Sequence, residues 1–269
     1  MALALALPLT LFVFYFFPVL REIVTPSFSA PHNATPLPAP TAGFIGQQLA
    51  HARVKTAWND KAAIVRRNLR DNALSENDLN ILISVYKDER LLEIHAKNAR
   101  ATNFKKVAAY DLCRLSGKLG PKRKQGDQQV PEGFYHINRF NPASSYYLSL
   151  GINYPNSADR KKSAATDLGG DIFIHGDCVT VGCLPMTDDK IKEIYLYAVH
   201  AKNSGQVKIP VYIFPFKMTA ATFARHAEKH RNEPELLAFW RNLQTGFERF
   251  TAKNMALNFS IDEDGGYRF

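Results

Sequence analysis

The stretch of residues 171–186 constrains the fold most strongly, because it joins strand-forming residues to two reactive side chains around one short loop. Residues 171–175 and 179–184 are rich in β-branched and apolar residues, a composition that predicts two strands. If these strands pair as antiparallel neighbours, the two ends of the loop meet across the ladder. The pattern therefore predicts that the His175 imidazole and the Cys183 thiol face each other.

This pair of side chains predicts an active site with a thiol nucleophile. A free cysteine has a pKa of about 8.5 and is mostly protonated at neutral pH, so it needs a base. His175 would take the proton of Cys183 and return it to the leaving group. Gly176, Thr180 and Gly182 are candidate backbone donors to an oxyanion, because the glycines allow close approach of the N–H groups.

Two other interpretations of these residues stay open. A buried cysteine is often an inert small hydrophobic residue, and a strand histidine is often a hydrogen-bonded core residue. His175, Cys178 and Cys183 also form an H-x2-C-x4-C pattern, within the range of structural zinc spacings, and His200 is a conceivable fourth ligand.

The same segment carries a family resemblance. It resembles the catalytic signature of the L,D-transpeptidase (YkuD-type) family, H-G followed by S/T-x-G-C-x-x-M/L, and most of all its YafK-like branch. The residues that match are His175, Gly176, Thr180, Gly182, Cys183 and Met186. Residues 130–135, 154–156 and 210–215 resemble further runs of that family, so the resemblance covers residues 78–217.

Two positions depart from the family pattern. Many members have an arginine two residues after the cysteine, where this chain has Pro185, and many have a polar residue where it has Val181. The arginine is a candidate for holding a substrate carboxylate, so its absence affects the expected donor specificity and leaves the nucleophile unchanged.

The resemblance implies an α+β fold, a mainly-β L,D-transpeptidase-type sandwich, with no cofactor. It implies that Cys183 attacks the carbonyl at the L-centre of diaminopimelate in a peptidoglycan stem peptide and releases D-alanine. An amine acceptor would give a transpeptidase product, either a cross-link or a wall-linked lipoprotein. Water would give a hydrolase that cleaves such links, and a non-catalytic wall-binding or zinc-stabilised domain is the remaining alternative.

The N-terminal region predicts export. Residues 2–20 are apolar and carry no charge, so residues 1–25 are expected to be a signal peptide or membrane anchor, and the proline-rich residues 26–42 a linker. The remainder would lie in the periplasm or cell envelope and meet the inner membrane only through residues 2–20.

An exported chain with three cysteines leaves one of them unpaired. A disulfide between Cys113 and Cys178 would keep Cys183 free, although both could also stay reduced. A bridge between Cys178 and Cys183 would instead silence the site and act as a redox switch.

The formal net charge is +9, from 34 basic and 25 acidic residues. Such a balance favours a polyanionic partner. No base-reading motif accompanies the charge, so we expect no nucleic-acid partner, and a carboxylate-rich wall polymer fits the charge equally well.

The remaining patterns divide the chain into further elements. Residues 43–77 predict a helical segment made of two short helices around Asn59 and Asp60, and residues 81–97 predict a hairpin that opens the catalytic domain, 78–217. Residues 207–216 predict an edge strand, because prolines lie near both ends. Residues 218–269 predict a C-terminal helical extension broken near Pro234.

Three residues are candidates for binding substrate. Tyr147 and Tyr154 lie in a tyrosine- and asparagine-rich stretch that could stack on sugars or bind peptides, and Asp177 follows the His-Gly pair. The same tyrosines would also suit ordinary half-buried strands.

Overall fold

The structure, a computed structural model, describes residues 43–269, which lie within the compact unit Pro38–Phe269. The predicted signal peptide or anchor (1–25) and the proline-rich linker (26–42) therefore lie outside the described residues. Within residues 43–269, no helix has both the length and the apolar character needed to cross a bilayer.

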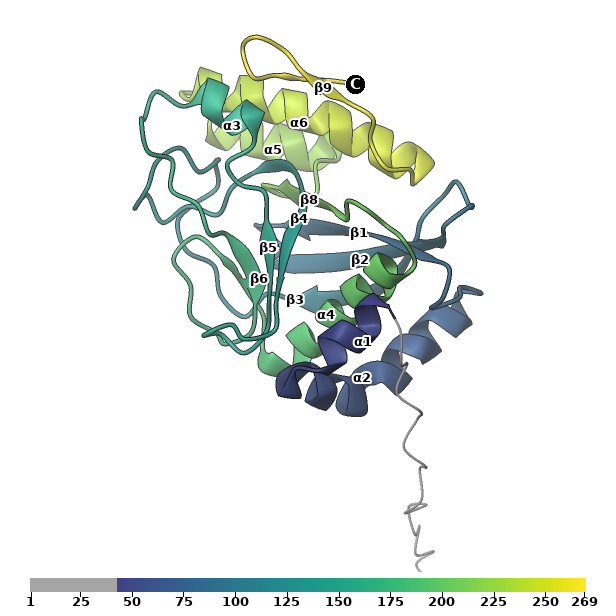
Figure 1. The fold of residues 1–269 in the computed structure, drawn as a ribbon. Coiled ribbons are helices and arrows are strands. Elements are labelled where there is room, and N and C mark those ends of the chain that lie inside the picture. Colours follow the sequence, from purple (N-terminus) through teal and green to yellow (C-terminus); the bar gives the residue numbers. More distant parts are fainter. Residues whose placement is uncertain (1–42) are drawn as a thin grey trace, which may run out of the picture. The chain divides into compact units, whose positions relative to one another are not determined.

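Eight strands form one curved sheet in the order β3-β2-β1-β8-β4-β5-β6-β7 (Figure 1). β1 (Leu79–Tyr86) and β2 (Leu91–Asn98) form the predicted hairpin, and β3 (Lys105–Asp111) continues it. The remaining strands are β4 (Gly133–Asn141), β5 (Ser149–Ile152), β6 (Phe173–His175), β7 (Leu184–Pro185) and β8 (Pro210–Phe214). β4 joins the two halves of the sheet, and its register with β5 shifts between Ile137 and Arg139.

The prediction that residues 207–216 form an edge strand is wrong. β8 lies inside the sheet, parallel to β1 on one side and antiparallel to β4 on the other. Pro210 is the first residue of β8 and Pro215 follows its last, so neither proline removes an N–H group from the interior of the strand. Prolines at strand ends are therefore compatible with a central position.

Three helices cover one face of the sheet: α1 (Phe44–Leu49), α2 (Ala52–Asp71) and α4 (Asp188–Asn203). The predicted break at Asn59–Asp60 is wrong, because both residues lie inside α2 and the chain turns at Ala50 and His51 instead. Asp60 faces α4, where its carboxylate lies 2.6 Å from the Lys192 ammonium. Asp60 therefore makes an interhelical ion pair from within a continuous helix.

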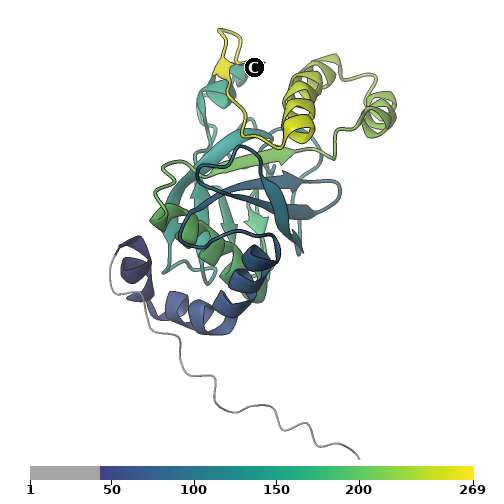
Figure 2. The same ribbon diagram turned by 90° about the vertical axis from the view of Figure 1, so that its right-hand side faces the viewer.

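The C-terminal residues cover the opposite face, as Figures 1 and 2 show. They form α5 (Ala220–Lys229), α6 (Pro234–Lys253) and the short hairpin of β9 (Ser260–Ile261) and β10 (Tyr267–Arg268). The sheet thus has a hydrophobic core on each face. In β8, Val211 and Ile213 point into the core under α1, α2 and α4, whereas Tyr212 and Phe214 point into the core under the C-terminal helices. A strand covered on both faces is apolar throughout, which agrees with its sequence.

The fold is therefore α+β, as predicted, with a sheet between an N-terminal helical segment and a C-terminal helical extension. A buried polar cluster joins the extension to the sheet. The Glu132 carboxylate lies 2.8 Å from the Lys87 ammonium and accepts hydrogen bonds from Trp240 Nε1 (2.9 Å) and the Gly120 N–H (2.7 Å). Glu132 thus connects α6 to the loop between β3 and β4.

Candidate active site

The two strands that flank the predicted site pair in parallel, so the antiparallel pairing expected from the sequence is wrong. Ile174 of β6 lies opposite Leu184 of β7. Residues 179–183 do not form a strand, and the connecting loop turns at Asp177 (φ 63°) and Gly182 (φ 93°). These two left-handed turns reverse the chain twice, so it re-enters the sheet in its original direction.

The parallel register still brings the two predicted catalytic side chains to one face. Because Leu184 is level with Ile174, Cys183 is level with Phe173, and His175 lies two residues further along β6 on the same side. His175, Thr180 and Cys183 all line one cavity of about 480 Å³. The structure thus assembles the predicted pair through a different strand arrangement.

Cys183 is the free thiol of the chain. Cys113 and Cys178 form a disulfide with a Cα–Cα distance of 5.7 Å, so neither the Cys178–Cys183 bridge nor the zinc set containing Cys178 is assembled. His200, the conceivable fourth ligand, is buried in α4 with its ring 5.3 Å from the Trp58 ring.

The His175 ring has one nitrogen in a hydrogen bond and one nitrogen without a partner in the described residues. Its Nδ1 lies 2.5 Å from the Gly176 carbonyl oxygen, and a carbonyl can only accept, so Nδ1 carries the proton. Nε2 is buried and has no hydrogen-bond partner within residues 43–269. Burial lowers the pKa of His175 below its ordinary value, although the bond to Gly176 opposes this. The resting imidazole is therefore neutral, with its lone pair on Nε2.

The Cys183 thiol is also neutral at rest. It is partly buried, and its Sγ lies 3.6 Å from the Asp171 carbonyl oxygen, to which it donates. Burial raises the pKa of Cys183, and the Asp171 carboxylate raises it further. A preformed thiolate is thus disfavoured, so Cys183 could act as a nucleophile only by losing its proton during the attack.

The candidate oxyanion donors differ in the resting structure: the Thr180 N–H makes no hydrogen bond within residues 43–269, whereas the others have acceptors. The Gly182 N–H donates to Ser116 Oγ (2.7 Å), and the Cys183 N–H donates to Thr180 Oγ1 (3.0 Å). The Gly176 N–H instead donates to the Leu148 carbonyl (3.1 Å). A hydroxyl acceptor can rotate away from its donor, whereas a backbone carbonyl beside a strand cannot.

Position 182 requires glycine. Its φ of 93° lies outside the range that side-chain-bearing residues favour, and a Cβ would stand 3.0 Å from the Gln129 carbonyl oxygen. The loop between β3 and β4 therefore presses directly against the residue before the thiol.

The three candidate substrate contacts do not line this cavity. Tyr154 is buried, with its hydroxyl 3.4 Å from the Lys122 carbonyl oxygen. The Tyr147 ring lies between two cations, 5.7 Å from both the Arg53 guanidinium carbon and the Lys192 ammonium. Asp177 is exposed, and its N–H donates to Asp188 (2.9 Å).

Other residues line the cavity that the sequence did not single out as contacts. The Tyr146 ring lies 4.7 Å from the His175 ring, so Tyr146 takes the place expected of its neighbour. Arg114 also lines the cavity, and its guanidinium makes no hydrogen bond or ion pair within the described part of the chain. The sequence offered one indication of this position. Arg114 follows Cys113, and a Cys113–Cys178 disulfide brings Cys113 to the loop that carries Cys178 and Cys183.

Comparisons with known proteins identify the family of this segment. Residues 80–213 match the family described as "L,D-transpeptidase catalytic domain" (YkuD). The protein named "Putative L,D-transpeptidase YafK" of Escherichia coli K12 is 38% identical over 172 residues, 63% of this chain and 66% of that protein. The counterpart from Escherichia coli O157:H7 gives the same values. The chain thus spans just under two thirds of the length of these curated relatives.

Two solved structures are also similar. The helical cell shape determining protein Pgp2 from Campylobacter jejuni is 18% identical, with a TM-score of 0.41 over 68% of this chain and 73% of that one. Bd1075 of Bdellovibrio bacteriovorus is 18% identical, with a TM-score of 0.37 over 66% and 72%. From the match of residues 80–213 and the identity to YafK, the chain belongs to the YkuD family of L,D-transpeptidase catalytic domains.

Proposed function

We propose that the protein is a cysteine L,D-transpeptidase that acts on peptidoglycan stem peptides in the cell envelope. The observation that carries this proposal is that the free Cys183 thiol and the unpartnered Nε2 of His175 belong to one cavity. An unpaired buried nitrogen costs stability, so its retention beside a thiol supports a chemical role.

Acylation follows from the neutral resting pair. Cys183 Sγ forms a bond to the carbonyl carbon at the L-centre of diaminopimelate as its proton passes to His175 Nε2. The tetrahedral intermediate then collapses, the C–N bond to D-alanine breaks, and the imidazolium gives its proton to the departing amine. Nδ1 stays bonded to the Gly176 carbonyl throughout, which leaves the Nε2 lone pair free to accept the thiol proton.

Two N–H groups are the best supported oxyanion donors. To bind a substrate oxygen, the N–H groups of Gly182 and Cys183 need to exchange only their hydrogen bonds to the hydroxyl groups of Ser116 and Thr180. Preorganised donors of this kind are worth about 10²–10³ in rate each. Gly176 is a weaker candidate, because its N–H is bonded to the Leu148 carbonyl.

Arg114 supplies a cation for substrate recognition. The sequence lacks the family arginine two residues after the cysteine, where Pro185 is buried in β7. The Arg114 guanidinium enters the same cavity from the loop after β3 and has no partner within residues 43–269. A planar guanidinium binds a carboxylate through two parallel hydrogen bonds, so it would hold the free carboxylate of the donor peptide.

The rim of the cavity supports an amine acceptor on a polymer. Val179 and Val181 line the cavity and are 44% and 72% exposed, so an acceptor strand can cover apolar surface beside the thioester. Hydrolysis is the second candidate, because the same openness admits water to the acyl-enzyme. A hydrolase of this kind would cleave peptidoglycan links, including those to a lipoprotein.

The test uses the full chain with disaccharide tetrapeptides and with sacculi that carry linked lipoprotein, read by mass spectrometry. Cross-linked dimers or newly linked lipoprotein, with a transient acyl adduct on Cys183, would support transpeptidation, whereas released lipoprotein remnants would support hydrolysis. Cys183→Ala should abolish either reaction. Thr245→Ala, an exposed change on α6 outside this cavity, is the control and should retain activity. Equal products from wild type and Cys183→Ala would refute the proposal.

A further inference from the structure

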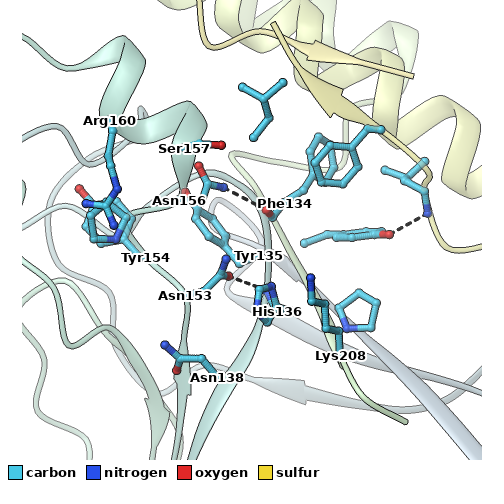
Figure 3. Close-up of a pocket in the computed structure, with 16 residues that line it drawn as sticks. Phe134, Tyr135, His136, Asn138, Asn153, Tyr154, Asn156, Ser157, Arg160 and Lys208 are labelled. Carbon is cyan, nitrogen blue, oxygen red and sulfur yellow. Dashed lines mark hydrogen bonds between the residues drawn. The ribbon is translucent and has the colours of Figure 1, made fainter.

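A second cavity, of about 610 Å³, lies on the sheet away from Cys183. Its floor is β4 and the start of β8, and its walls are α3 (Ser157–Lys162) and the C-terminal residues 257–261 (Figure 3). Residues 257–261 lie outside the matched segment 80–213, so one wall belongs to this chain's own extension.

Five polar side chains of this cavity have no partner within residues 43–269. They make no hydrogen bond or ion pair there, and they belong to His136, Asn138, Ser157, Arg160 and Lys208. Figure 3 draws Arg160 and Lys208 on opposite sides, with His136 and Asn153 between them. The cavity therefore offers unused hydrogen-bonding groups along its length.

The charge of the lining has one sign. Arg160 and Lys208 contribute two cations, and no aspartate or glutamate lines the cavity. The nearest acid on α3, Asp159, is buried and is already bonded to the Asn156 N–H and the Tyr135 hydroxyl. Such a lining selects a ligand that carries carboxylates and amide groups.

The second cavity shares a face of the sheet with the thiol cavity. Arg139, Gly151 and Phe173 form a row across β4, β5 and β6, and the Arg139 guanidinium carbon lies 4.7 Å from the centre of the Phe173 ring. Phe173 lines the thiol cavity and Asn138 lines the second one.

Gly151 lies between residues that line the two cavities. The position of a Cβ there would lie 2.9 Å from Asn138 Oδ1, 3.2 Å from the Phe173 ring and 3.3 Å from Arg139 Cβ. Asn138 of the second cavity and Phe173 of the thiol cavity therefore approach each other over residue 151, beside Arg139.

We propose that the second cavity is a substrate-binding subsite for a carboxylate-bearing peptide stem of peptidoglycan, held by Arg160 and Lys208 while the thiol cavity holds the reacting bond. This inference rests on the proposed function for the identity of the polymer. Asn138 and His136 bind the peptide amides between the two cations. With this subsite, the protein would contact the substrate well beyond the bond that reacts.

The test measures binding calorimetrically on the full chain carrying Cys183→Ala, so that the ligand is not consumed. The probe is a disaccharide tetrapeptide with free carboxylates, compared with its fully amidated form. Arg160→Gln with Lys208→Gln should weaken binding of the acid form about tenfold, which is a few-fold for each exposed cation, and should hardly change binding of the amidated form. Arg225→Gln with Lys229→Gln removes two exposed cations of α5 and is the matched control, with no expected loss.

The subsite would be refuted if the Cys183→Ala chain did not bind the acid tetrapeptide measurably, or if the Arg160/Lys208 variant bound it with the same affinity. It would also be refuted if the variant lost equal affinity for the acid and amidated probes, or if a glycan without peptide bound as tightly as the tetrapeptide. The thiol chemistry is read separately, from acylation of the chain with native Cys183 by a short free tetrapeptide. If acylation fails while binding still depends on Arg160 and Lys208, the proposed function falls and the subsite stands. If acylation succeeds while binding ignores them, only the subsite falls.

Discussion

Replacing Gly182 by alanine tests how the fold positions the nucleophile. The new Cβ would stand 3.0 Å from the Gln129 carbonyl oxygen, closer than such contacts normally come, at a φ of 93° that disfavours side chains. Either the loop between β3 and β4 moves outward, or residues 182 and 183 move away from it. Both movements disturb the bond from the Gly182 N–H to Ser116 and the direction of the Cys183 thiol.

The magnitude separates into two parts. Forcing a non-glycine residue to this φ costs about 1–2 kcal/mol. For a domain of this size that lowers Tm by about 2–8 °C. Displacing the thiol by a fraction of an ångström to 1 Å adds a kinetic loss of up to about 10²-fold in acylation.

Gly205 provides the control, because its φ is 94° and a Cβ there would meet nothing within 4 Å. Gly205→Ala should therefore lose a similar amount of stability and no acylation rate. Thermal unfolding by calorimetry gives the first quantity, and single-turnover acyl-enzyme formation by intact mass gives the second. If Gly182→Ala acylates at the wild-type rate while its Tm falls like that of Gly205→Ala, Gly182 does not position the nucleophile.

Four further predictions concern the site and the disulfide beside it. Because burial lowers the pKa of His175, kcat/KM should fall only as the pH drops below the ordinary histidine value and protonates Nε2; an acid limb centred above pH 6.5 would contradict the burial argument. Because burial raises the pKa of Cys183, alkylation by iodoacetamide should keep accelerating above pH 9.0, and a plateau near neutrality would indicate a preformed thiolate. The disulfide closes a separation of 65 residues, so Cys113→Ser with Cys178→Ser should lower the free energy of unfolding by up to about 4 kcal/mol, measured by urea denaturation; an unchanged midpoint would show that the bridge does not constrain the unfolded chain. Arg114→Ala should raise KM for the acid tetrapeptide about tenfold, an effect that Arg114→Lys restores only in part, and an unchanged KM would exclude Arg114 from carboxylate binding.

Local signals in the sequence predicted several elements well. The hairpin of β1 and β2 follows from two apolar runs around a charged turn. The C-terminal helices follow from the helical pattern of residues 218–269, which breaks before Pro234. The candidate pair of His175 and Cys183 was predicted because a thiol, a histidine and two glycines fall within a few residues of one another, and the structure places both side chains in one cavity.

What the sequence did not predict depends on contacts between distant segments. The central position of β8 is set by β1 and β4, which its prolines do not reveal. The parallel pairing of β6 with β7 depends on two left-handed turns, one of them at an aspartate rather than a glycine. Arg114 enters the cavity from a loop far away in the sequence, and only the fold shows that it does.

The cluster around Glu132 limits how far this catalytic domain is modular. Trp240, in a helix that follows the family segment, donates to a carboxylate that also binds Lys87 and the Gly120 N–H. Gly120 belongs to the same loop that presses on Gly182. A chain cut after β8 would leave a buried ion pair short of one donor and uncover the apolar face of the sheet. The catalytic domain and its C-terminal extension can therefore be exchanged only together, because a helix of the extension helps to hold the loop that contacts the residue before the Cys183 thiol.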